Sequence, residues 1–293
     1  MTLPAMDEKM LERYPRFSWG DIKKRLAEKA PFEAISPMGT SLIRVKNYEP
    51  LIGLAVHAGH RVREELIPKM AIEEDERAYE EDLFVEHFIV DFPIQMIGLD
   101  SRYEYDVNRP KEQAVYLKPF QSWGKKVWQN PPTKDELQIS HQKYDEFHEL
   151  MDFLIGEIGG PQRKAVVFDV HSYNSKRPQQ PDRNAQFPLF ILGTAALDRK
   201  KHGKSIEFVL SDLDKIQLPG FTVTVKENEI FKGDGAIAKT IVKNYPDSFV
   251  INLEVKKMYM DELTGKGDEK MIRLLANEIH KLGQKTLDQF LCS

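Results

Sequence analysis

The sequence predicts an α/β fold in which a mixed, largely parallel central sheet is flanked by helices. Short apolar runs rich in Val, Ile and Phe recur along the chain, each bounded by polar or turn residues and too short for a helix. Between these runs, apolar residues recur at helical spacing. With 293 residues, 41% of them hydrophobic, and no internal repeat, we expect one domain over residues 1–293.

The expected strands follow the apolar runs in chain order, at 51–59, 94–102, 164–172, 187–194, 221–225 and 248–255. The clearest helix spans 133–158, because Thr133 and Glu136 have capping-box spacing and an apolar stripe follows them. A second amphipathic helix is expected at 268–292, where Gly283 could introduce a kink. The polar stretch 172–186 predicts a long loop beside the strand that precedes it.

Charge and cysteine content exclude several functional classes. The net charge of -4, from 42 Lys and Arg against 46 Asp and Glu, predicts no nucleic-acid partner. Cys292 is the single cysteine, so a metal would require His, Asp or Glu ligands. The N-terminal segment has early acids and no apolar core, and no run approaches the roughly 20 residues of a membrane span. We therefore expect a cytoplasmic protein without a membrane partner.

Several expected strands end in reactive side chains, and the carboxyl ends of strands are where ligands collect in open α/β sheets. The run "LAVHAGH" ends in His57 and His60, "FDVHSYN" contains His171, and "VINLEV" carries Glu254. Two histidines and a carboxylate, with one coordination position left for water, form a hydrolytic zinc site. The strand ends therefore predict a zinc hydrolase.

Six short motifs occur in sequence along the chain, as "HAG", "EEDLFVEHF", "SRYEYDVNRP", "DVHSY", "FKGDGAI" and "INLEVKKMYMDE". In their order and spacing they resemble the motifs of the N-formylglutamate amidohydrolase family, which is related to zinc carboxypeptidases and aspartoacylases. Val56 and Ala58 replace the proline and serine that usually flank the first histidine in the family. The resemblance implies a phosphorylase/hydrolase-like, zinc-carboxypeptidase-like sandwich, and the two replacements bear on the choice of substrate more than on metal binding.

His57 and His171 are the expected histidine ligands, each binding through one nitrogen of a neutral imidazole. His57 fills the family position. His60 remains an alternative to it because both lie in one tight segment.

Asp82 is the expected carboxylate ligand, since it lies in the acidic segment that the resemblance assigns to this role. Glu81 adjoins it. Glu64 and Glu65 are further alternatives, because the carboxylate ligand of the related carboxypeptidases closely follows the first histidine.

The segment "SRYEYDVNRP" predicts recognition of an anionic substrate, because a guanidinium binds a carboxylate through two hydrogen bonds. By resemblance to the wider group of zinc hydrolases, Arg109 and Asn108 would hold the substrate's carboxylate and Arg102 would face the polarised carbonyl. Asp106 would steady the arginines. The alternative is a surface cluster of salt bridges.

Glu254 is the expected general base, since a charge on an apolar strand needs a reason and a carboxylate near a metal can accept a proton from water. Its alternative is an ion pair with Lys256 on the same strand face. Asp169 shares the strand side of His171 and could orient it. Tyr173 shares that side and could donate to the substrate, or it could only cover the strand end.

Together these residues predict a zinc-dependent hydrolase that acts on a non-peptide C–N bond in a small, carboxylate-bearing amide. The resemblance implies N-formyl-L-glutamate as substrate, with formate and glutamate as products. The alternatives are a carboxypeptidase-like or aspartoacylase-like hydrolase and a binding protein that retains the pocket without turnover. The oligomeric state stays open.

Overall fold

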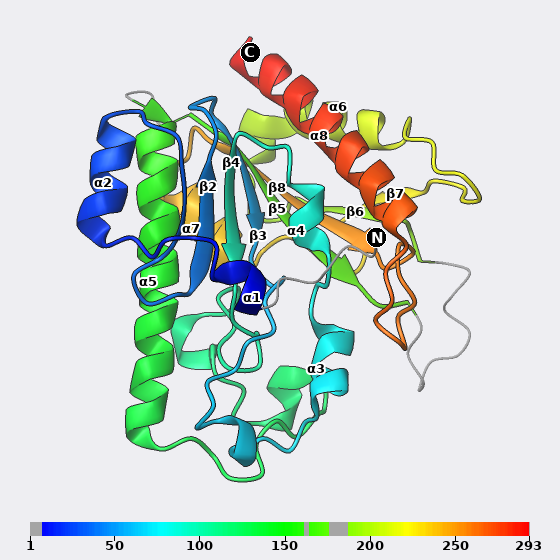
Figure 1. The fold of residues 1–293 in the computed structure, drawn as a ribbon. Helices are drawn as coiled ribbons and strands as arrows, with labels where there is room; N and C mark the ends of the chain where they lie inside the picture. The colour runs from blue at the N-terminus through cyan, green and yellow to red at the C-terminus, as the bar shows by residue number, and fades with distance from the viewer. Residues whose placement is uncertain (1–7, 161–163, 176–186, 293) are drawn as a thin grey trace.

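The computed structural model describes residues 8–160, 164–175 and 187–292. Within these ranges eight strands form one sheet in the order β1-β2-β4-β3-β5-β8-β6-β7 (Figure 1). The strands are β1 Phe32–Ile35, β2 Ser41–Val45, β3 Leu51–Ala55, β4 Ile94–Gly98, β5 Val166–Tyr173, β6 Phe190–Gly193, β7 Val225–Glu227 and β8 Phe249–Lys256. The four central strands β4, β3, β5 and β8 are parallel, whereas β1, β2 and β6 introduce antiparallel pairs. The predicted mixed α/β sheet is confirmed.

Helices cover both faces of this sheet (Figure 1). They are α1 Glu8–Leu11, α2 Trp19–Ala27, α3 Glu74–Glu80, α4 Val85–Phe88, α5 Lys134–Ile158, α6 Arg199–Leu213, α7 Ala236–Asn244 and α8 Glu269–Leu291, with 3-10 turns at Ile67–Lys69, Lys111–Gln113 and Pro119–Ser122. Apolar residues of α2, α5 and α7 form one core with the sheet, and those of α4, α6 and α8 form the other. None of the helices in the described ranges has the length and apolar character needed to cross a bilayer.

The strands β5 and β8 reach further than their neighbour β3. They pair over their whole length, from Val166 opposite Phe249 to Tyr173 opposite Lys256. Pairing between β3 and β5 stops at Leu54 opposite Asp169. The ends of β5 and β8 therefore project past the end of β3, and this step in the sheet leaves room for a site.

Polar residues replace apolar ones on a single face of these projecting ends. Alternate residues of a strand share a face, and on the α5 side β5 presents Val167, Asp169 and His171, while β8 presents Val250, Asn252 and Glu254. The opposite face remains apolar as far as Val170 and Val255, under α8 and its neighbours. On the α5 side, the ends of β5 and β8 thus carry polar side chains that are available for a site. On the opposite side, their apolar side chains pack in the core under α8.

The two expected long helices are confirmed, with Thr133 capping α5 through its side chain and the Glu136 backbone. Helix α8 continues through Gly283, where a Cβ would lie 2.9 Å from the Phe92 ring. Close packing on the sheet, rather than a break in the helix, thus accounts for this glycine. Residues 176–186 of the expected loop lie outside the described residues.

Several expected strand boundaries differ from the structure, including that of the strand expected at 187–194, which lies at Phe190–Gly193. The strand expected at 221–225 lies at Val225–Glu227, since β7 is an edge strand that pairs only with β6. The strands expected at 51–59 and 94–102 end at Ala55 and Gly98. The strands β1 and β2 were not expected, because their apolar runs are short.

Candidate functional site

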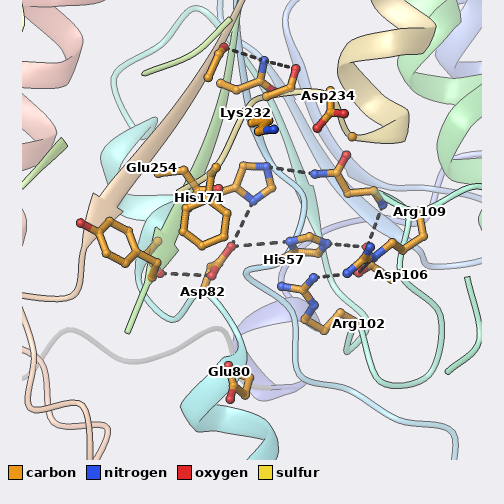
Figure 2. A pocket seen from close by; sticks show the side chains of 18 of the residues that line it. His57, Glu80, Asp82, Arg102, Asp106, Arg109, His171, Lys232, Asp234 and Glu254 are labelled. Carbon is orange, nitrogen blue, oxygen red and sulfur yellow. Dashed lines mark hydrogen bonds and ion pairs between the residues drawn. The ribbon is translucent and has the colours of Figure 1, made fainter. Parts of the chain in front are cut away.

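A cavity of about 240 Å³ lies at the projecting ends of β5 and β8 (Figure 2). It is lined by every residue for which the sequence predicted a catalytic, substrate-binding or metal-binding role, namely His57, Asp82, Arg102, Asn108, Arg109, His171, Tyr173 and Glu254. These residues come from five separate stretches of chain. The tertiary fold therefore brings the predicted residues into one pocket.

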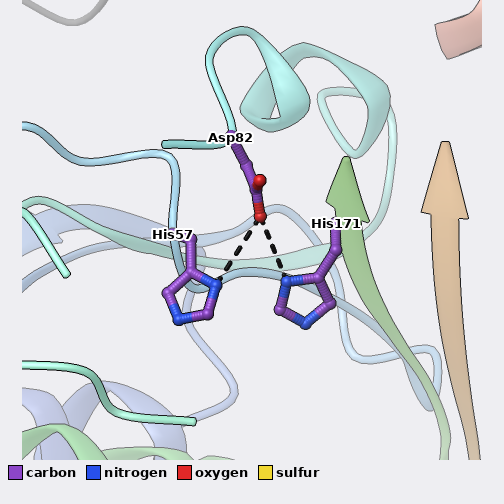
Figure 3. A group of neighbouring side chains, drawn as sticks. All are labelled: His57, Asp82 and His171. Carbon is purple, nitrogen blue, oxygen red and sulfur yellow. Dashed lines mark hydrogen bonds and ion pairs between the residues drawn. The ribbon is translucent and has the colours of Figure 1, made fainter. Parts of the chain in front are cut away.

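His57, Asp82 and His171 form a compact buried group whose ligand atoms lie within 4.8 Å of one another (Figure 3). Asp82 Oδ2 lies 3.6 Å from His57 Nδ1 and 3.2 Å from His171 Nδ1. His57 Nδ1 is buried and has no hydrogen-bond partner in the described part of the chain. Two imidazoles and a carboxylate that converge around such an unpaired nitrogen suit a zinc ion.

The outward nitrogen of each histidine faces a second buried carboxylate. His57 Nε2 lies 2.7 Å from Asp106 Oδ1, and His171 Nε2 lies 3.1 Å from Asp169 Oδ1. A carboxylate at Nε2 favours the tautomer that carries its proton there, which leaves Nδ1 as the ligand atom. Both histidines are thus oriented with Nδ1 toward Asp82.

The charges of the group reinforce one another. Burial opposes ionisation of Asp82, but its hydrogen bonds and charge interactions with His171 and His57 hold the pKa of Asp82 well below the usual value. Burial likewise disfavours the charged form of His171, but Asp169 and Asp82 outweigh it and raise the pKa of His171 well above normal. In the metal-free protein, the positive charge of protonated His171 therefore offsets part of the negative charge of these carboxylates, which a bound metal ion would otherwise neutralise.

The alternative ligands lie outside this group. His60 is not one of the three residues that could hold a metal in the described ranges, and Glu64 and Glu65 are exposed. Glu81 is buried, but it accepts a hydrogen bond from Ser101 Oγ. Loss of water around Glu81 raises its pKa to about 7. The geometry therefore favours His57 and Asp82 over these alternatives.

Asp106 organises one wall of the pocket. Its carboxylate accepts hydrogen bonds from Arg102 Nη2 at 2.8 Å, from the Asn108 backbone at 2.8 Å and from the Tyr116 hydroxyl. The Arg102 guanidinium also lies over the Trp123 ring, 4.8 Å from its centroid. Arg102 is therefore held at the pocket by several partners at once.

Asn108 and Arg109 follow on the same loop. Asn108 Oδ1 accepts from the Ile237 backbone at 3.2 Å, and its Nδ2 lies 3.5 Å from His171 Nε2. Arg109 has a side chain that is 42% exposed, and its Nε lies 3.9 Å from Asp106 Oδ2. Asn108 is thus largely engaged by the protein, whereas Arg109 retains donors for a ligand.

Glu254 lies opposite His171 in the register of β5 and β8 and is partly exposed to the cavity. Loss of water around its carboxyl raises the pKa of Glu254 to about 8, because desolvation outweighs the attraction of His171 and Arg102. The hydroxyl of Tyr173 donates to the Pro188 carbonyl. Donation from Tyr173 to a substrate would therefore require that bond to be exchanged.

The cavity also contains residues to which the sequence assigned no role, among them Glu80, Trp123, Lys232 and Asn252. Lys232 lies in the motif "FKGDGAI", so its presence in the site had a signal in the sequence. Asn252 shares its strand face with Glu254, which parity could have indicated. Trp123 follows a short 3-10 turn that carried no such signal.

The chain matches the family model for N-formylglutamate amidohydrolase over residues 49–260. No curated protein matches it. Among solved structures, a crystal structure of N-formylglutamate amidohydrolase from Ralstonia eutropha JMP134 is 15% identical, with a TM-score of 0.66 over 86% of this chain and 98% of that one. A gene product of Agrobacterium tumefaciens is 16% identical, with a TM-score of 0.63 over 85% and 95% of the two chains. At these identities the likeness concerns the fold.

Proposed function

Since the chain belongs to the N-formylglutamate amidohydrolase family, we propose that it is a zinc-dependent amidohydrolase that cleaves N-formyl-L-glutamate to formate and glutamate. The observation that carries this proposal is the buried group of His57, Asp82 and His171 beside Glu254 in one small cavity. A metal-ligand set and a carboxylate with a raised pKa are the two parts that hydrolysis of an amide requires.

The zinc ion would be held by His57 Nδ1, Asp82 and His171 Nδ1, the atoms that converge in this structure. When bound there, it would supply a Lewis acid that polarises the acyl carbonyl and makes water a better nucleophile at neutral pH. Asp106 and Asp169 would keep both imidazoles in the required tautomer from their outer sides.

Glu254 would move the proton. Its carboxylate would accept a proton from the attacking water and later return it to the departing amide nitrogen, so that glutamate leaves as an amine. A pKa of about 8 suits a group that must both take and give a proton near neutral pH. Desolvation by the surrounding protein is the cause of that value.

The arginines would bind the charged parts of the substrate. Arg102, fixed by Asp106 and Trp123, would face the acyl oxygen as negative charge develops on it. Arg109, with its half-exposed guanidinium, would hold the carboxylate next to the amide nitrogen, and Asn108 would keep this loop in place.

The proposal is tested by metal analysis of the purified protein followed by a hydrolysis panel on the zinc-loaded form. N-formyl-glutamate, N-acetyl-glutamate and a dipeptide ending in glutamate differ only in the acyl group, and the Glu254→Gln protein serves as the background control. We expect turnover of the N-formyl compound that is lost with a chelator and restored by zinc. Preferred turnover of the other compounds would assign an aspartoacylase-like or carboxypeptidase-like activity. Absence of turnover on the whole panel would favour a binding protein.

A further inference from the structure

The motif "FKGDG" at 231–235 forms part of the cavity wall, but neither metal binding nor proton transfer uses it. Lys232 lies in this motif and is labelled on the wall of the pocket in Figure 2. It is an exposed residue, and within the described ranges its ammonium group makes no ion pair and donates no hydrogen bond. Lys232 is therefore a cation on the cavity wall whose hydrogen-bond donors remain available to an anionic ligand.

One end of this turn is fixed to the sheet. Gly233 has a φ of +69°, and a Cβ on it would lie 2.4 Å from the Gly193 carbonyl oxygen at the end of β6. The Lys232 carbonyl accepts a hydrogen bond from the Ala195 backbone at 2.8 Å. Only glycines permit this approach of two backbones. The backbone of Lys232 is therefore held at a defined position beside the cavity.

The other end of the turn is fixed to the loop that carries Arg109. Asn108 accepts hydrogen bonds from the Ala236 backbone at 3.0 Å and from the Ile237 backbone at 3.2 Å. A Cβ on Gly235 would lie 2.1 Å from Asn108 Oδ1. The turn therefore joins the Arg109 loop to the β6 side of the pocket. Arg109 and Lys232 thus lie on segments of the cavity wall that are hydrogen-bonded to each other.

The charged groups around the cavity leave two cations with spare donors. Arg102 is engaged by Asp106 and by the Trp123 ring. Arg109 is 42% exposed, and Lys232 is unpaired within the described residues. The neighbouring Asp234 faces Lys239, 3.5 Å away. Two cations on one small cavity match a ligand with two carboxylates.

We infer that Lys232 binds the second carboxylate of the substrate and so restricts this site to N-acyl amino acids with an acidic side chain. Arg109 would hold the carboxylate beside the amide nitrogen, and Lys232 the one on the side chain. This inference rests on the proposed function and deepens it, because it assigns the selectivity to one side chain. The cavity of about 240 Å³ is smaller than the pockets of roughly 300–1,000 Å³ that hold drug-sized ligands, as expected for a substrate as small as an N-acyl amino acid.

The test compares Lys232→Met with wild type on N-formyl-glutamate and N-formyl-glutamine, which have nearly the same shape but differ in side-chain charge. Wild type should prefer the glutamate compound, and Lys232→Met should reduce the ratio of the two kcat/KM values about 10- to 100-fold, chiefly through KM for the acidic substrate. Lys239→Met is the matched control, since Lys239 is an exposed lysine near the same turn but outside the cavity lining. It should keep the wild-type ratio.

An unchanged ratio in folded Lys232→Met, or a wild-type protein without preference for the acidic compound, would overturn the inference. Melting temperatures of the three proteins verify that each is folded. If wild type hydrolyses neither compound, the proposed function fails, and calorimetric titration of the zinc-loaded proteins with both compounds decides the role of Lys232 alone. The inference is supported if wild type binds N-formyl-glutamate more tightly than N-formyl-glutamine and Lys232→Met loses this difference. It is rejected if wild type binds the two compounds equally, or if Lys232→Met keeps the difference.

Discussion

The two histidines of the site have the same chemical surroundings but reach them by different routes. Each faces Asp82 with Nδ1 and a further carboxylate with Nε2. His171 lies within β5, and its partner Asp169 is two residues earlier on the same strand face. His57 lies beyond the end of β3, and its partner Asp106 comes from a loop that follows β4.

The two outer carboxylates also differ in how they are held. Asp106 accepts hydrogen bonds from Arg102, Tyr116 and the Asn108 backbone as well as from His57. Neither oxygen of Asp169 has a hydrogen bond of normal geometry within the described residues, so its role depends on the approach of His171. The half of the site formed by His57 and Asp106 is therefore held by a hydrogen-bond network between several segments. The half formed by His171 and Asp169 lies on a single strand.

Loss of either histidine should have the largest effect, because both halves are needed for the metal. We expect about one zinc per chain in wild type and most of it lost in both His57→Ala and His171→Ala. Elemental analysis of the dialysed proteins measures this, with His60→Ala as the matched control from the same segment. Full occupancy in either of the first two variants, or loss in His60→Ala, would contradict the ligand assignment.

Glu254→Gln should lower kcat at least about 100-fold, because the amide keeps the shape of the side chain but cannot accept a proton. Zinc content and melting temperature should remain close to those of wild type. Steady-state kinetics and metal analysis on one preparation check this prediction. Activity within a few-fold of wild type would mean that the base lies elsewhere in the cavity.

Replacing the outer carboxylates sharpens the difference between the two halves. Asp106→Asn and Asp169→Asn should each weaken zinc binding by about 10- to 100-fold. Asp106→Asn should have the larger effect and should also raise KM, because it releases Arg102. Competition with a chelating dye and steady-state kinetics measure the two quantities. Equal losses, with KM unchanged, would mean that the Asp106 network does not extend to substrate binding.

The smallest expected effect is on the pH dependence of metal binding. Asp169 and Asp82 raise the pKa of His171 in the metal-free protein, so His171 is protonated at neutral pH and must lose that proton when it binds zinc. Zinc affinity should therefore rise with pH, by up to about tenfold per pH unit for one released proton. In Asp169→Asn, zinc affinity should change less steeply with pH near neutrality. The same steep slope in both proteins would show that Asp169 does not couple zinc binding to the proton on His171.

Much of the architecture could be predicted from the local pattern of the sequence. The strands at 164–172 and 248–255 and the helices at 133–158 and 268–292 lie close to their expected positions, because long apolar periodicities and caps act over neighbouring residues. The edge strand β7 and the short strands β1 and β2 were displaced or missed. A strand of three to five residues is specified by the neighbour with which it pairs more than by its own sequence.

The sequence by itself determined which residue types could perform the chemistry, because motif order and strand parity relate Asp169 to His171 and indicate Glu254. Only the tertiary structure decided that Glu254 lies opposite His171, that Asp106 faces His57, and that the turn of Lys232 reaches the loop of Arg109. The physical reason is that parity fixes the side of a strand to which a residue points, whereas contacts between distant segments depend on register, strand length and the close approach of backbones at glycines.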